Sequence, residues 1–175
     1  YLNMPELPEV ESIRLQLQKY LVGHRIENIE VRSTRIFSGN VCDLVGGKVT
    51  AIRRFAKVLS VDLDNGLSVL IHVKLTGQLI YRGPNLKSAS VLSAKVVGGV
   101  PGKHTHVIFK LDNPPSHKAS EGQGAALYYN DVRQFGWIKA VKSEELKVKD
   151  DFIRKLGPEP NVNPKNPPEK ILTLD

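Results

Sequence analysis

The sequence of 175 residues contains a single cysteine, Cys42. One cysteine cannot form an intramolecular disulfide, and it excludes a zinc site with several cysteine ligands within these residues. No apolar run approaches the ~20 residues of a membrane-spanning helix, and the first residues lack the basic-then-apolar order of a secretion signal. We therefore expect a cytoplasmic protein with no membrane partner and no metal or other cofactor in this chain.

Acidic residues are fewer than basic ones. Asp and Glu number 18, whereas Lys and Arg number 25, which gives a formal net charge of +7. Such an excess is typical of proteins that bind polyanions, although many basic domains are merely well solvated. Charge alone therefore leaves nucleic-acid binding open, while the length indicates one ordinary domain with its own hydrophobic core.

The order of apolar residues predicts a β-rich fold with a helix at each end. Val10, Ile13, Leu17 and Leu21 recur at helical spacing and predict a helix over 5–21 that stops at Gly23. Strands are expected at 25–32, 48–55, 57–63, 67–73, 77–83 and 103–112, with a further strand pair at 125–131 and 135–141. The segment Asp64-Asn65-Gly66 is a strong hairpin signal.

The remaining segments predict loops, a closing helix and a linker. Residues 84–102 and 113–124 are expected to be loops, and 143–157 a helix capped by Gly157. The proline-rich segment 158–175 is typical of a linker. The predicted fold class is mainly β (α+β): a β-sandwich or flattened antiparallel barrel flanked by an N-terminal and a C-terminal helix.

The segment MPELPEVES, residues 4–12, allows two interpretations. In the structural one, proline suits the first helical turn and the glutamates Glu6, Glu9 and Glu11 favour its partial positive charge. In the chemical one, a free N-terminal Pro5 is a secondary amine that can attack a sugar carbon and form an iminium, with Glu6 moving protons. The segment by itself does not decide between them.

The same segment resembles the start of the formamidopyrimidine-DNA glycosylase and endonuclease VIII family. Five further segments resemble the family in the same order along the chain: RRFAKVL (53–59), IHVKLTGQL (71–79), KHTHVIF (103–109), DVRQFG (131–136) and LGPEP (156–160). Together they favour the formamidopyrimidine branch and its amino-terminal catalytic domain.

The resemblance implies a DNA-repair enzyme that works through a Schiff base. In the family, the initiator methionine is removed and the exposed proline attacks the sugar of an oxidised purine nucleotide (formamidopyrimidine or oxoguanine). The enzyme releases the base and then cleaves the strand as an abasic-site lyase. This role falls on Pro5, proton transfer at the sugar falls on Glu6, and support of the site geometry falls on Glu9.

The resemblance also assigns DNA contacts. Lys57 and His72 match residues that contact phosphate beside the lesion, a role that suits cations near an extruded nucleotide. Leu75, Arg133 and Phe135 match the trio that enters the duplex when the damaged base leaves, which suits an apolar wedge, a hydrogen-bonding guanidinium and a stacking ring. Without the family, a lysine like Lys57 is more often solvated and a histidine like His72 more often a core residue. Phe135 could likewise be a core residue and Arg133 a turn residue.

Several features depart from the family pattern. Residues 1–4 precede Pro5, and an acylated proline has no lone pair for attack, so we expect an expression scar or extension and an inactive fragment. The catalytic domain is expected at 5–157 and an interdomain linker at 158–175. The helical and four-cysteine zinc-finger half is then absent, and zinc is expected there. Leu75 replaces the usual methionine, and Gln134 replaces a common basic residue.

These expectations define the competing functions. The first is a monomeric, bacterial glycosylase and lyase, acting at the nucleoid on double-stranded DNA with oxidised purines or abasic sites. The second is a non-catalytic damaged-DNA-binding domain whose terminus is naturally blocked. The third is a basic β-domain that binds RNA or protein, for which the six resembling segments would be accidental.

Overall fold

The computed structural model describes residues 6–83, 90–91, 100–112 and 124–146. The helices are α1 (Leu7–Leu21), the short α2 (Val41–Leu44) and the 3-10 turn η1 (Ser143–Glu145). The strands are β1 (Ile26–Val31), β2 (Phe37–Ser38), β3 (Val49–Phe55), β4 (Val58–Leu63), β5 (Leu67–His72), β6 (Gly77–Arg82), β7 (Ser90–Val91), β8 (Thr105–Leu111), β9 (Ala126–Asp131) and β10 (Trp137–Lys142).

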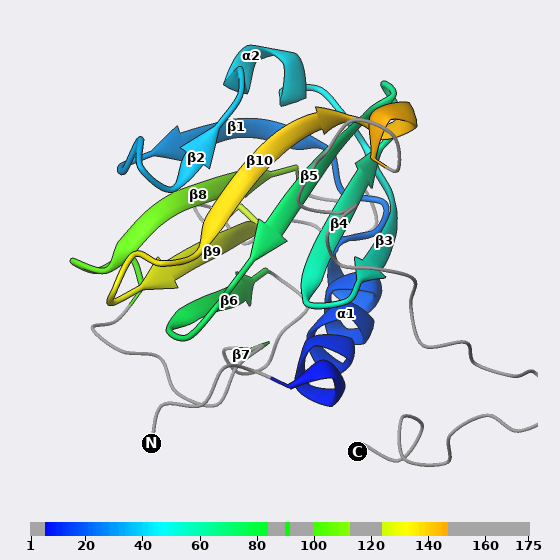
Figure 1. Cartoon of the computed structure of the whole chain (residues 1–175). Helices are drawn as coiled ribbons and strands as arrows, with labels where there is room; N and C mark the ends of the chain where they lie inside the picture. The colour runs from blue at the N-terminus through cyan, green and yellow to red at the C-terminus, as the bar shows by residue number, and fades with distance from the viewer. Residues whose placement is uncertain (1–5, 84–89, 92–99, 113–123, 147–175) are drawn as a thin grey trace, which may run out of the picture.

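The strands form two sheets of five strands each, packed face to face (Figure 1). The strand order is β1-β8-β9-β6-β7 in the first sheet and β2-β10-β5-β4-β3 in the second. All neighbours are antiparallel except β2 and β10, which pair in parallel over two residues. The predicted mainly β fold is confirmed as a sandwich of two sheets, not as a closed barrel.

One hydrophobic core lies between the sheets and beneath α1. The helix contributes its buried residues Val10, Ile13, Leu17 and Leu21, which are the four that the helical spacing predicted. They join side chains from both sheets in one contiguous cluster. The helix lies beside β3 and β4, at one edge of the second sheet (Figure 1). None of the described helices is long and apolar enough to cross a membrane.

The hairpin at residues 64–66 is confirmed: β4 and β5 pair antiparallel across it, and Gly66 adopts φ +80°. A positive φ costs glycine nothing because it has no Cβ, which explains its place in this turn. Gly23, at φ +95°, follows α1 as the predicted stop.

Several sequence predictions need correction. The segments 125–131 and 135–141 are strands, but β9 pairs with β6 and β8, whereas β10 pairs with β2 and β5, so the two do not pair with each other. Residues 90–91 form a strand beside β6 inside a predicted loop. The predicted helix at 143–157 begins as η1, and its remainder after residue 146 lies outside the described residues.

Candidate functional site

The segments that carry the predicted site residues lie toward one end of the sandwich, which we call the site end (Figure 1). These segments are the start of α1, the β3–β4 turn at residues 56–57, the end of β5 with the β5–β6 connection at 73–76, and the β9–β10 connection at 132–136. Pro5, the predicted nucleophile, lies outside the described residues.

Glu6 is the residue that caps the start of α1 through its backbone alone. Its backbone is extended, and its carbonyl oxygen accepts hydrogen bonds of 3.1 Å from the N–H groups of Glu9 and Val10. Its side chain is exposed and makes no capping hydrogen bond. Of the structural interpretation, only the attraction of the Glu6 charge to the helix start therefore remains.

Glu11, one turn further along α1, ties the helix to the turn that carries Lys57. Its carboxylate accepts hydrogen bonds from Arg54 Nε at 2.7 Å and from Arg14 Nη2 at 2.7 Å. Arg54 also donates from Nη1 to the carbonyl oxygen of Ala56 at 3.0 Å, and Ala56 adopts φ +50°. One guanidinium thus joins α1 to the backbone beside Lys57.

The paired arginines hold the pKa of Glu11 below its usual value although burial opposes them. Burial is the largest single influence and raises the pKa, but the hydrogen bonds and charges of Arg14 and Arg54 together outweigh it. Glu11 is therefore ionised at neutral pH. From the sequence, Glu11 is only a possible charge at the helix start. Its i, i+3 spacing to Arg14 is the one local sign of an ion pair at this position.

His72 lies at the end of β5, between two neighbouring strands. It pairs with Val58 on β4 and with Trp137 on β10, and the His72 and Trp137 rings are 5.7 Å apart. Burial, followed by the charges of Lys74 and Lys57, lowers the pKa of His72 from 6.5 to about 4. The ring is consequently neutral at pH 7.

The tautomer of His72 follows from its neighbour. The backbone N–H of Lys74 donates to His72 Nδ1 at 3.0 Å, so Nδ1 is the acceptor and the ring proton resides on Nε2. His72 is thus a neutral hydrogen-bond donor, and Lys57 and Lys74 supply the positive charge around it.

The three predicted wedge residues occupy two neighbouring connections, 73–76 and 132–136, which we call the wedge connections. Leu75 is half-buried on the first, whereas Arg133 and Phe135 are exposed on the second, Phe135 at 51%. An aromatic ring exposed to that extent is unusual for a core residue, so the core interpretation of Phe135 is wrong.

A buried carboxylate joins the two wedge connections. Asp131 accepts hydrogen bonds from the N–H groups of Gln134 at 3.0 Å and Gly136 at 2.9 Å, and from the hydroxyl of Thr76. The Thr76 hydroxyl in turn accepts from the N–H of Arg133 at 3.1 Å. The sequence DVRQFG gives no sign of this role for Asp131, because the contact that joins the two connections comes from Thr76, which is distant in sequence.

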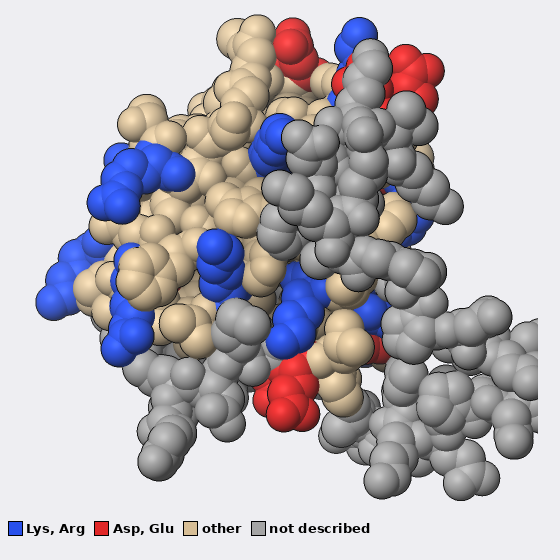
Figure 2. Space-filling view, in the orientation of Figure 1, with Lys and Arg blue, Asp and Glu red and all other residues tan. Residues whose placement is uncertain are grey.

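Basic side chains are spread over the visible face of the second sheet and along its lower and left edges (Figure 2). Acidic side chains gather near α2 and η1 at the top of this view and near the start of α1 at the bottom. Arg53 also lies over the Phe55 ring, 5.1 Å from its centre. A surface of mixed cations and aromatic rings suits phosphates and bases.

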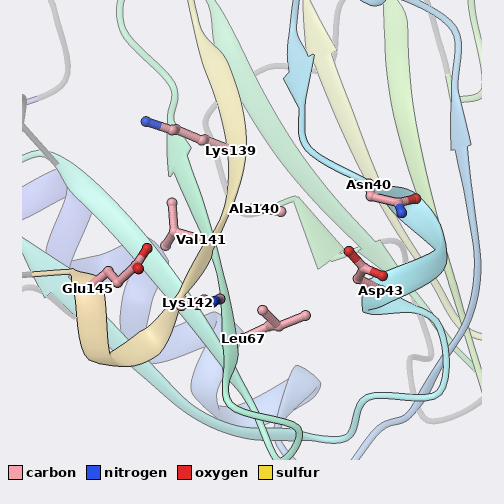
Figure 3. A pocket seen from close by; sticks show the side chains of 8 residues that line it. All are labelled: Asn40, Asp43, Leu67, Lys139, Ala140, Val141, Lys142 and Glu145. Carbon is pink, nitrogen blue, oxygen red and sulfur yellow. The ribbon is translucent and has the colours of Figure 1, made fainter. Parts of the chain in front are cut away.

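A hollow of about 350 Å³ lies at the opposite end of β5 and β10 (Figure 3). Its lining comes from the β2–α2 region, β5, β10 and η1: Asn40, Asp43, Leu67, Lys139, Ala140, Val141, Lys142 and Glu145. None of the predicted site residues borders it. Within the described ranges, no three His, Cys, Asp or Glu side chains are grouped to hold a metal ion.

The chain is similar to curated bacterial proteins over nearly its whole length. The formamidopyrimidine-DNA glycosylase of Desulfitobacterium hafniense is 33% identical over 162 residues, which cover 90% of this chain and 50% of the relative. That of Aliivibrio fischeri is 36% identical over 164 residues, which cover 91% of this chain and 50% of the relative. The chain thus spans about half the length of these relatives.

Solved structures give the same likeness. The wild-type Lactococcus lactis Fpg in complex with DNA containing N7-benzyl-Fapy-dG aligns with a TM-score of 0.61 at 25% identity, over 81% of this chain and 45% of that chain. A complex between the LlFpg protein, a THF-DNA and an inhibitor aligns with the same TM-score, identity and coverage.

The family model described as the formamidopyrimidine-DNA glycosylase N-terminal domain matches residues 4–138. This match includes α1, the strands from β1 to β9, the first two residues of β10 and both wedge connections. The chain therefore belongs to the formamidopyrimidine-DNA glycosylase family, of which it carries the N-terminal domain.

Proposed function

We propose that this chain is the catalytic part of a bifunctional DNA glycosylase and abasic-site lyase that excises oxidised purines, formamidopyrimidine and oxoguanine, in base-excision repair. The observation that carries the proposal is that the α1 start, the Lys57 turn and the two wedge connections all lie toward the site end. The names of the curated relatives and the damaged DNA in the L. lactis complex support it.

The chemistry proposed for Pro5 and Glu6 requires Pro5 to be the first residue, where its nitrogen is a free secondary amine next to the Glu6 carboxylate in the sequence. The proline nitrogen forms a bond to C1′ of the sugar as the bond to the damaged base breaks, and the base leaves with the electron pair and takes up a proton. The nitrogen loses its proton and its electron pair forms the C1′=N bond as the C1′–O4′ bond breaks and O4′ takes up a proton, which opens the sugar ring. The resulting iminium withdraws electrons, so that a proton can be lost from C2′ and the 3′ phosphate can leave, which breaks the strand. The free Glu6 carboxylate is suited to moving protons during ring opening.

The proposed DNA contacts are of two kinds: some side chains bind phosphates, and others fill the space from which a nucleotide is extruded. Lys57 and Lys74 attract phosphates as point charges, and His72 donates one hydrogen bond from Nε2 without carrying charge. Leu75, Arg133 and Phe135 occupy the space left by the extruded nucleotide. We expect the protein to be a monomer in a bacterial cytoplasm, and a zinc finger to lie in the half of the relatives that this chain does not span.

Borohydride trapping on DNA with an abasic site tests the proposal. Protein that begins at Pro5 and extends to its natural carboxyl end should form a covalent complex, because borohydride reduces the iminium to a stable amine. The same protein with Tyr1–Met4 ahead of Pro5 is the matched control and should form none, because its proline nitrogen is an amide. The Glu6→Gln variant of the first protein should lose base release while remaining folded.

Each alternative gives a different result. Trapping of the blocked protein at a lysine, located by mass spectrometry of the peptide, would contradict the assignment of Pro5. If both proteins bind the damaged duplex and neither is trapped, the chain is a damage-binding domain without catalysis. If neither prefers DNA to RNA, the DNA-repair proposal fails and the basic β-domain that binds RNA or protein is favoured.

A further inference from the structure

The wedge connections share an unusual position in the fold. Residues 73–76 lead from β5 in the second sheet to β6 in the first, and residues 132–136 lead from β9 in the first sheet back to β10 in the second. Both connections therefore cross between the sheets at the same end of the sandwich (Figure 1). Their relative position decides where Leu75 lies with respect to Arg133 and Phe135.

Asp131 is the side chain that sets this relative position. It is completely buried at the end of β9, and each of its carboxylate oxygens accepts two hydrogen bonds. Thr76 and Gln134 donate to Oδ1, while Gly136 and the Tyr129 hydroxyl donate to Oδ2, the latter at 3.0 Å. Thr76 belongs to one wedge connection and Gln134 and Gly136 to the other.

The chemistry of this cluster requires a carboxylate. Its four donors in the described part of the chain are all neutral, so the charge of Asp131 is buried without a cationic partner, an arrangement that costs free energy. Burial also raises the pKa of Tyr129, which keeps its hydroxyl a donor. An asparagine would turn an N–H toward at least one backbone N–H, so it cannot accept all four bonds.

The surrounding backbone leaves little room for adjustment. A Cβ at Gly136 would lie 1.8 Å from the Tyr129 hydroxyl oxygen, and a Cβ at Gly77 would lie 2.7 Å from it. Gln134, in the second connection, adopts φ +55°, and Lys74, in the first, adopts φ +45°. Residues other than glycine rarely adopt this backbone conformation unless neighbouring contacts hold them in it.

We propose that Asp131 is a positioning residue that holds the two wedge connections in one preset arrangement, so that Leu75, Arg133 and Phe135 enter damaged DNA together. The inference rests on the proposed function. Preset loops bind more tightly than mobile ones because less conformational entropy is lost on binding. The wedge acts only where a base has left the stack, so loss of the arrangement weakens binding to damaged DNA more than binding to undamaged DNA.

The test is the ratio of dissociation constants for an undamaged duplex and a duplex carrying a tetrahydrofuran abasic analogue. It uses the protein that begins at Pro5 and extends to its natural carboxyl end. A ratio is insensitive to the fraction of protein that is folded, so a merely structural role does not change it. Asp131→Asn should lower this ratio about tenfold, the effect expected when one interaction that orders the wedge connections before binding is removed.

Two Thr76 variants separate the hydroxyl from the rest of the side chain. Thr76→Val removes the hydroxyl that joins Asp131 to the Arg133 N–H and should lower the ratio about threefold, whereas Thr76→Ser keeps it and should retain the wild-type ratio. These variants keep the inference testable if Asp131→Asn does not fold.

Asp62→Asn is the matched control. Asp62 accepts hydrogen bonds from Ser60 at 2.9 Å, Ser68 at 2.7 Å and Arg53, but it faces the outer side of the second sheet away from the wedge connections. Its substitution should lower stability and leave the ratio unchanged.

The outcomes separate this inference from the proposed function. If wild-type protein has no preference for the abasic duplex, the proposed function fails. If wild-type protein has the preference and both Asp131→Asn and Thr76→Val stay within about twofold of its ratio, the positioning role is wrong. A ratio lowered equally by Asp62→Asn would also overturn it.

Discussion

The low pKa of His72 predicts a specific dependence of stability on pH. Its pKa is about 4 in the folded protein, compared with 6.5 for an ordinary histidine. Between these values the unfolded chain takes up a proton that the folded protein does not, so acid favours unfolding. Stability from this site is fully present above pH 6.5, declines as the pH falls below 6.5 and is lost near pH 4.

The magnitude follows from the two pKa values. Between pH 7.5 and pH 5.0, the difference in proton binding at this one site lowers the free energy of unfolding by about 2 kcal/mol. The interval stops at pH 5.0 because carboxylates such as Glu11, whose pKa is lowered in the folded state, begin to contribute below it.

Urea unfolding at the two pH values, followed by the fluorescence of Trp137, measures this loss. His72→Gln should show a loss about 2 kcal/mol smaller than that of the wild type, because glutamine does not titrate. Lys57→Gln should reduce the loss more modestly, since one of the two charges that oppose protonation is removed. Lys48→Gln, a change at the opposite end of β3, should leave it unaltered.

The reasoning is refuted if wild type and His72→Gln lose equal stability between pH 7.5 and pH 5.0. An increased loss in Lys57→Gln would also refute it, because removal of a nearby positive charge can only ease protonation of the ring.

Two further predictions concern stability measured by urea unfolding. Glu11→Ala should lower the free energy of unfolding by about 3 kcal/mol, because the Glu11 side chain is only 15% exposed and its removal takes a carboxylate away from the largely buried Arg54. Glu30→Ala should lower it by less than about 1 kcal/mol, because the Glu30 side chain in its ion pair with Arg32 is 40% exposed. Equal costs would contradict the role given to burial. Gly136→Ala should cost about 2 kcal/mol or more through its clash with Tyr129. Gly124→Ala should be nearly neutral, because the added Cβ makes only an ordinary contact of 3.8 Å with the Leu111 carbonyl oxygen; a tolerated Gly136→Ala would show that the wedge connection can move.

The regular elements could be predicted because their signals are local. The helical spacing in α1 and the hairpin at residues 64–66 need only neighbouring residues, and both are confirmed. The short elements β2 and α2 were missed because their cause is tertiary or confined to one side chain. β2 exists through two residues of parallel pairing with β10, and α2 is one turn begun by Asn40, whose side chain accepts from Cys42 N–H at 3.0 Å.

The candidate site could also be predicted only in the part that depends on local segments. The family-like segments located Glu6, Lys57, His72 and the wedge residues, whose roles stay predictions. They did not reveal how the segments are joined, because the contacts that join them, Thr76 to Asp131 and Arg54 to Glu11, are between residues distant in sequence. The assignment of the segments at 125–131 and 135–141 to separate sheets was likewise inaccessible, since strand character does not state which partner a strand takes.

The sheet-to-sheet course of the wedge connections has a mechanical consequence. A hairpin loop within one sheet can yield under load while the core stays intact, but a link between two sheets transmits the load to both. If Leu75 and Phe135 enter a duplex as proposed, the resistance of the base stack would be borne by the whole sandwich. Core variants distant from the wedge connections should then weaken the proposed insertion before they unfold the protein.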